Sequence, residues 1–157
     1  MNKPSVPTPP FVEASPPYEL DVYGWAFAQA RLVREGRFAV MDATNVAEEL
    51  EDLGSSIQGS AESALRVLMM HLLKWRHQPE RRSRSWASTI AVQRVHFDKI
   101  MRKNPSLKAT LEEMRADSYR LARLEASGET DLPLKTFPVE PLDWAVILDE
   151  PFEFDSD

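Results

Sequence analysis

The sequence predicts an all-α fold, and three observations indicate it. Apolar residues recur at three- and four-residue spacing through most of the chain, which is the period of an amphipathic helix. No run of alternating apolar and polar residues is long enough to support a sheet. The prolines gather at the start of the chain and between the helical patterns, where they interrupt no helix interior. We expect a helical bundle of about four main helices around one long central helix.

The size and composition narrow the class of protein further. A chain of 157 residues and 17.9 kDa is the size of one ordinary domain. Its net charge of −6 argues against a bulk binder of nucleic acid or anionic membranes. With no cysteine, the chain has no disulfide, no thiolate metal site and no thiol chemistry. No apolar run reaches the roughly 18 residues that a membrane span needs, and no secretory signal is present, so we expect a cytoplasmic protein that does not contact a membrane.

The start of the chain is rich in proline. Residues 1–17 hold six of the 12 prolines. Proline fixes φ and lacks a backbone hydrogen-bond donor, so these residues are expected to form a disordered, flexible arm without regular secondary structure. Residues 18–154 are then expected to form a single helical domain.

The first helical pattern and the turn after it follow this arm. From Tyr18 to Val33 the apolar residues keep helical spacing, and Gly36 is suited to the position just past the helix. A short turn is expected to carry Phe38 and Met41 toward the core. An Asp, Thr or Asn within residues 42–45 can cap the next helix.

The second helix is predicted to be long and central, over residues 45–77. In its first half Leu50 and Leu53 fall on one apolar line, and its second half is apolar on nearly every side. Gly54 and Gly59 cost about 1 kcal/mol each inside a helix, so a kink or break is expected over residues 54–60. Pro79 should end the helix, because the residue before a proline disfavours α geometry.

Three further helices complete the prediction. The third carries apolar residues over 86–101, and the fourth is expected over residues 105–126, with Gly128 closing it. The prolines of residues 129–142 exclude a helix interior there. A last short helix is expected over residues 143–148 and is predicted to lie across the bundle.

Charge is segregated along the chain. Residues 66–103 hold ten basic and two acidic residues, whereas residues 125–157 hold ten acidic and one basic. Residues 1–65 are acidic again, with ten acidic and four basic residues. The basic middle therefore has acidic partners on both sides within the same chain.

No established catalytic or cofactor motif is present. The glycine- and serine-rich residues 54–60 lack the lysine of a phosphate-binding loop, and no strand precedes them. No acidic residue lies three positions before or four positions after His71 or the other histidines, so no metal site and no cofactor are predicted. His71 lies on the apolar line and is interpreted as a hydrogen-bonded core histidine.

Two charged segments supply the candidate site. Glu49 lies at the edge of the predicted core, where a carboxylate needs a cationic partner, and we expect an ion pair with an arginine of residues 80–84. Residues 71–86 combine two tryptophans with several basic residues. That mixture is typical of binding hot spots and could stack bases, or it could be internal structure. The candidate interaction or structural cluster consists of Glu49, Asp52, His71, Trp75, Gln78, Arg81, Arg82, Arg84 and Trp86.

Four segments together resemble one known family. They are Tyr18–Trp25, Asn45–Gly54, His71–Trp86 and Leu148–Phe152, in that order. The chain resembles the bacterial domain-of-unknown-function 29 family over roughly residues 18–154. The resemblance implies a small, all-helical, cytoplasmic protein, and it implies no catalytic residue, cofactor or substrate.

Three functions are weighed on these grounds. The leading prediction is a helical interaction module without catalytic activity, which binds another protein or a second copy of itself. The first alternative is nucleic-acid binding through the basic residues 74–84. The second is an enzyme of unknown class with a cleft that joins Glu49, Asp52 and His71 to the arginines.

Overall fold

A computed structural model describes residues 15–151 of the chain. The all-α prediction is confirmed, and the described residues contain no strand. Most of the predicted arm, residues 1–14, lies outside the described residues, as do residues 152–157. The α-helices are α1 (Val22–Arg34), α2 (Ala43–His77), α3 (Arg84–Lys103), α4 (Leu111–Thr130) and α5 (Trp144–Leu148).

Contacts within the chain separate it into two compact units. The first unit is residues 1–54, and the second is residues 55–157. The sequence-predicted boundaries, an arm over 1–17 and one domain over 18–154, stay a prediction. None of the helices in the described part of the chain combines the length and apolar character that crossing a membrane requires.

The helix ends of the first unit follow from their residues. The Asp21 carboxylate caps α1 by accepting a hydrogen bond from the Gly24 N–H at 2.8 Å. Gly36 has a φ of 69°, a left-handed conformation that favours glycine, as predicted for the residue past this helix. Asp42 accepts a hydrogen bond from the Asn45 N–H at 3.3 Å at the start of α2, so the capping residue is the first of the predicted candidates.

Two expectations about apolar residues of the first unit are wrong. Phe38, in the 3₁₀ turn Phe38–Val40, is 63% exposed rather than buried. Leu50 and Leu53, on the predicted apolar line of α2, are 63% and 58% exposed. Helical periodicity identifies which residues share a face, but burial requires a second element packed on that face, and the first unit supplies none there.

The break expected over residues 54–60 is also wrong, because α2 is continuous from Ala43 to His77. Gly54 and Gly59 both lie inside this helix, so the cost of two glycines is too small to interrupt it. The division between the two units nevertheless falls at Gly54. The helix ends at His77, just before the Gln78-Pro79 pair, as predicted.

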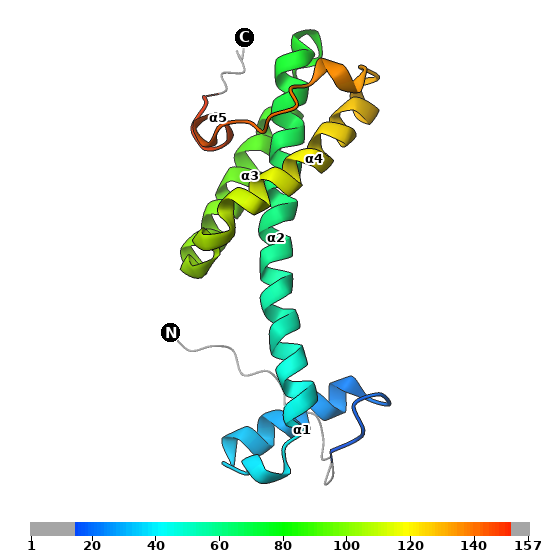
Figure 1. The fold of residues 1–157 in the computed structure, drawn as a ribbon, viewed down its shortest axis with the longest axis vertical. Coiled ribbons are helices and arrows are strands. Elements are labelled where there is room, and N and C mark those ends of the chain that lie inside the picture. The colour runs from blue at the N-terminus through cyan, green and yellow to red at the C-terminus, as the bar shows by residue number, and fades with distance from the viewer. Residues whose placement is uncertain (1–14, 152–157) are drawn as a thin grey trace. The chain divides into compact units, whose positions relative to one another are not determined.

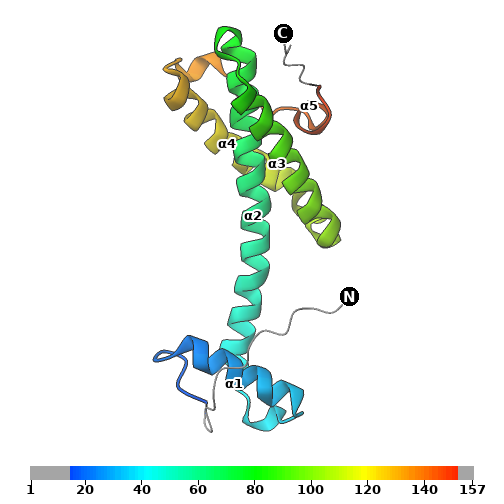
Figure 2. The ribbon, with the colours of Figure 1, turned by 180° about the vertical axis from the view of Figure 1, so that it is seen from behind.

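The core of the second unit forms around the second half of α2. Figures 1 and 2 show α3 and α4 packed along this part of α2, with α5 beside α3. Leu65, Leu68, Met69, Leu72 and Leu73 of α2 are fully buried, which confirms the predicted helix with apolar residues on nearly every side. Such burial supplies most of the stability of an amphipathic bundle.

The fourth helix begins and ends later than predicted. Residues 105–110 form a 3₁₀ segment, and the α-helix starts only at Leu111. Gly128 lies inside α4, and the residue past the helix is Asp131, with a φ of 58°. Aspartate tolerates the left-handed conformation better than most residues, so it ends the helix in place of glycine. The last helix is close to its predicted bounds.

Candidate functional site

The nine predicted site residues divide between the two units. Glu49 and Asp52 belong to the first unit, and the other seven belong to the second. The hydrogen-bond partner of Glu49 is Tyr18, whose hydroxyl donates to its carboxylate at 2.6 Å. This bond to an ionised acceptor is the main reason why the pKa of Tyr18 is raised. The ion pair expected between Glu49 and an arginine of residues 80–84 stays a prediction.

A polar and aromatic network holds the first unit together. The Trp25 indole N–H donates to the Asp42 carboxylate at 3.1 Å, and the Asp42 backbone N–H donates to the Gln29 side-chain oxygen at 2.8 Å. The rings of Tyr18 and Trp25 meet edge to face at 4.9 Å. A hydrogen bond from the Asn45 side chain lowers the pKa of Asp42. These contacts join α1 to the start of α2.

Sequence reasoning missed this network as a unit. Its members lie in or next to two segments that carry the family resemblance, Tyr18–Trp25 and Asn45–Gly54. The available signal was that tyrosine and tryptophan, whose side chains carry a hydrogen-bond donor, occur near carboxylates in the sequence. No spacing rule pairs the Trp25 indole with Asp42 in particular.

The first unit also carries a set of large apolar side chains that water can reach. Leu20 is the most exposed, at 82%, and Tyr23 is 63% exposed. We call the following the first-unit apolar residues: Leu20, Val22, Tyr23, Val33, Phe38, Val40, Leu50 and Leu53. Exposed apolar side chains that lie together as one patch are typical of a surface that another molecule covers.

Carboxylates accompany these apolar side chains on α2. Glu48, Glu51 and Asp52 are exposed, and among the described residues none of the three makes an ion pair. Over residues 15–54 the first unit has eight acidic and three basic residues. Any surface that covers this part of α2 therefore meets negative charge.

His71 lies within the second unit and is half-buried, beside the core rather than inside it. Its Nδ1 is 2.9 Å from the carbonyl oxygen of Val67, one turn earlier on α2. Burial lowers the pKa of His71, so the neutral ring is favoured. A neutral ring with the proton on Nδ1 donates to that carbonyl. Within the described residues, no cluster of three histidine or acidic side chains is placed to hold a metal ion.

Several polar side chains in and next to the segment between the two tryptophans contact the protein itself. Lys74 is buried, pairs with Glu129, and lies 4.6 Å from the ring centre of Trp86. The Arg82 guanidinium donates to the Trp75 carbonyl at 2.9 Å and lies over the Trp75 ring at 5.0 Å. These contacts tie the end of α2 to the turn that precedes α3.

The remaining three residues of the cluster differ in their environment. The Gln78 side chain is buried and donates to the Thr130 carbonyl at 3.0 Å, which links the turn to the end of α4. Arg81 and Arg84 are exposed, and in the described part of the chain neither forms an ion pair. Their charges are therefore available to another molecule.

Arg94 is a structural residue that the sequence did not reveal. From α3 its guanidinium donates to three backbone carbonyls, those of Val146, Ile147 and Glu150, at 3.0, 2.8 and 2.7 Å. The last carbonyls of a helix lack intrahelical partners, so this one side chain caps α5. Burial lowers the pKa of Arg94. An arginine within a helical pattern is expected to lie on the surface. Its position among its neighbours does not indicate a contact with a helix more than 50 residues later in the chain.

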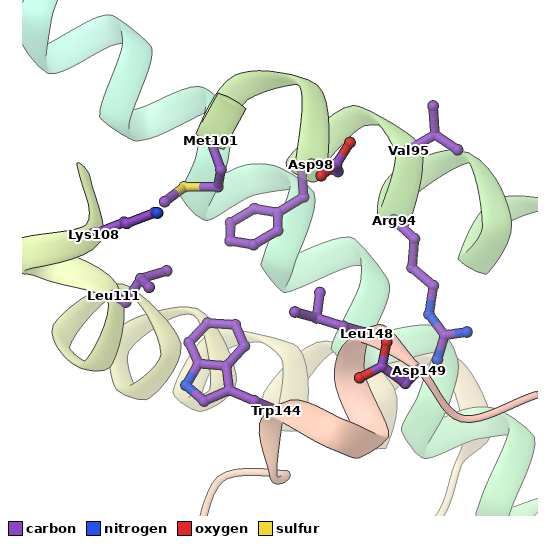
Figure 3. Close-up of a pocket in the computed structure, with 10 residues that line it drawn as sticks. Arg94, Val95, Asp98, Met101, Lys108, Leu111, Trp144, Leu148 and Asp149 are labelled. Carbon is purple, nitrogen blue, oxygen red and sulfur yellow. The ribbon is translucent and has the colours of Figure 1, made fainter. Parts of the chain in front are cut away.

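A pocket of about 610 Å³ lies between α3, the start of α4 and α5 (Figure 3). Its apolar walls are Phe97, Met101, Leu111, Trp144 and Leu148. The Phe97 and Trp144 rings are stacked at 6.1 Å. The Trp144 indole N–H donates to Glu112 at 2.6 Å, and this bond lowers the pKa of Glu112.

The same pocket carries charged residues at its edge, namely Arg94, Asp98, Lys108 and Asp149. Arg94 is committed to α5, and Asp98 pairs with Arg102 at 2.8 Å. Lys108 makes no ion pair with any described residue, and Figure 3 shows its amine directed toward Met101. The pocket therefore combines apolar walls with one available cation.

A comparison with known protein families identifies the family to which this sequence is related. The family model described as "Domain of unknown function DUF29" matches residues 17–153, nearly the whole chain. The chain belongs to the DUF29 family. The family resemblance inferred from the sequence is therefore confirmed. Comparison with curated proteins and with solved structures gives no match.

Proposed function

We propose that this DUF29 protein is a helical protein-interaction module that acts without catalysis and associates with a second copy of itself. The observation that carries the proposal is the exposure of the first-unit apolar residues. A small unit that leaves Leu20 82% exposed and Leu50 63% exposed gains stability when another surface removes these side chains from water.

Charge favours a second copy as the partner. The carboxylates of Glu48, Glu51 and Asp52 in the first unit have no ion pair among the described residues, and the second unit has unpaired bases at Arg81 and Arg84. In a two-fold dimer, the acidic first unit of each copy meets the basic segment of the other, so both sets of charges are matched at once.

The alternative functions have less support. Lys74 and Arg82 are engaged with Glu129 and Trp75, so a nucleic acid would find mainly Arg81 and Arg84 on this segment. His71 donates to a backbone carbonyl of its own helix, which gives a catalytic role no support. Nucleic-acid binding, an enzymatic cleft and the cytoplasmic location stay predictions from the sequence.

Charge-reversal variants test the proposal. One variant carries Glu48→Lys, Glu51→Lys and Asp52→Lys, and the other carries Arg81→Glu and Arg84→Glu. Each variant alone should be monomeric in sedimentation velocity, because like charges then oppose each other at both contacts of the dimer. An equimolar mixture should form a heterodimer, since opposite charges again face each other. Lys135→Glu with Glu140→Lys is the matched control and should leave the dimer unchanged.

The outcomes separate self-association from charge matching within one chain. If the wild type is a dimer and the mixture restores a dimer that both variants have lost, the proposal stands. A wild type that is monomeric at every concentration overturns it, as do variants that remain dimeric on their own.

A further inference from the structure

The pocket between α3, the start of α4 and α5 has the size and the lining of a small-molecule site. Its volume of about 610 Å³ lies within the roughly 300–1,000 Å³ that such sites occupy. The rings of Phe97 and Trp144, stacked at 6.1 Å, form its aromatic part. The remaining apolar lining includes Met101, Leu111 and Leu148. Walls of this kind favour a ligand that carries an aromatic ring.

The two carboxylates that line this pocket, those of Asp98 and Asp149, each have a positive neighbour. Asp98 pairs with Arg102 at 2.8 Å. Asp149 acts on the guanidinium of Arg94, because burial lowers the pKa of Arg94 and the charge of Asp149 opposes that shift. Figure 3 shows Arg94 and Asp149 on the same side of the pocket. Each negative charge of the lining is therefore offset by an arginine of α3.

Lys108 adds a positive charge that no carboxylate of the described residues offsets by an ion pair. It is exposed, and Figure 3 shows it on the opposite side of the pocket from Asp149. Glu112, which accepts from the Trp144 indole, pairs with Arg115 at 2.6 Å. The pocket therefore favours a ligand with one negative charge at the Lys108 side.

We propose that this pocket binds a small aromatic carboxylate, with its ring against Trp144 and its carboxylate beside the Lys108 amine. Binding removes the ring and the pocket walls from water, and the ion pair selects an anion over a neutral or cationic molecule of the same shape. This inference concerns the second unit alone and does not depend on self-association through the first unit.

Three compounds of the same shape test the charge requirement. Hydrocinnamate has a carboxylate, hydrocinnamamide is its neutral amide, and phenylpropylamine is a cation. Isothermal titration calorimetry measures the affinity of the full chain for each compound. The indole N–H resonances of the four tryptophans report where the ring binds, and Trp144→Phe identifies the resonance of Trp144.

Hydrocinnamate should bind about fivefold more tightly than its amide, which is the effect of one exposed ion pair, and should shift the Trp144 resonance. Lys108→Gln should abolish this preference. Lys135→Gln, at an exposed lysine outside the lining, is the matched control and should retain it. Asp149→Asn should not weaken binding, because the carboxylate of the ligand lies at the other side of the pocket.

Several results would overturn the proposal. Among these are no detectable binding of hydrocinnamate, equal affinity for the acid and the amide, and the highest affinity for the amine. A shift confined to the other three tryptophans would place the ligand elsewhere. Weaker binding of hydrocinnamate by Asp149→Asn, or an unchanged preference in Lys108→Gln, would show that Lys108 does not select the ligand.

Discussion

The two units of the chain are stabilised in different ways. In the second unit the apolar side chains of α2 are buried among α3, α4 and α5, and Leu65, Leu68 and Leu72 have no exposed surface. In the first unit, buried residues of α1 such as Trp25 and Gln29 take part in hydrogen bonds, while many apolar side chains remain exposed. One helix, α2, contributes leucines to both environments.

The difference shows that an apolar stripe on a helix predicts burial only where another element packs against it. The second unit uses its stripe to close a core, so its stability follows from burial. The first unit relies on directed hydrogen bonds between α1 and the start of α2, and its leucines Leu50 and Leu53 remain exposed. The comparison predicts that substitutions of the same kind have unequal effects in the two units.

The largest expected effect is a truncation in the core of the second unit. Leu65→Ala removes a fully buried side chain and should lower the free energy of unfolding by about 2–5 kcal/mol. Leu53→Ala, on the same helix but 58% exposed, should change it by less than about 0.5 kcal/mol. Urea denaturation of dilute protein measures both. Equal losses for the two leucines would remove the distinction between the units.

Removal of the Arg94 side chain should have the next largest effect. Arg94→Met leaves three carbonyls of the α5 region without their donor and should cost about 2 kcal/mol, because those groups then depend on water. Hydrogen exchange should become faster at the amides of Ile147 and Asp149. Lys99→Met, on the exposed side of α3, is the control. Unchanged exchange in the Arg94 variant would mean that α5 is held by its apolar contacts alone.

The sequence predicted the helices well because their signals are local. Helical periodicity, Pro79 at the end of α2 and Gly36 past α1 each depend on a few neighbouring residues. The exposure of Leu50 and Leu53 could not be predicted, because it depends on which elements reach the start of α2. Gly128 misled the prediction for α4 in a different way, since glycine can lie inside a helix that packing supports.

The candidate site could be predicted only in part. Residues 71–86 stand out in the sequence as a dense group of tryptophan and basic side chains, but periodicity cannot distinguish an arginine that stacks on Trp75 from one that faces solvent. The role of Arg94 and the pocket beside Trp144 depend on contacts between segments about 50 residues apart. No spacing rule within one helix reports such contacts.

A smaller effect is expected from the hydrogen bonds of the first unit. Trp25→Phe keeps the ring near Tyr18 but removes the N–H that donates to Asp42, and should weaken the first unit by about 1 kcal/mol. Native-state hydrogen exchange should report this loss at amides of α1. Tyr23→Phe, at an exposed residue of the same helix, should have no effect. Equal exchange in both variants would show that the indole bond does not stabilise the unit.

The smallest expected effect is a dependence on pH through His71. Because burial lowers the pKa of His71 in the folded state, the unfolded chain binds the proton more readily. The stability that comes from the neutral ring is fully present above the unfolded pKa of about 6.5, and it is lost as the pH falls through the lower folded pKa. His71→Gln should therefore flatten the decline in stability between pH 7 and lower pH, measured by urea denaturation. If the decline in stability is unchanged, other titratable groups cause it. These include His77, whose pKa is also lowered by burial.

The central claim is that the first unit presents its apolar and acidic surface to a second copy of the chain. Light scattering of the purified full-length protein over a range of concentration and salt tests it most directly. The account predicts a mass twice the 17.9 kDa of one chain, with dissociation favoured by added salt and by Leu50→Ala with Leu53→Ala. A mass of one chain at every concentration and salt would contradict it.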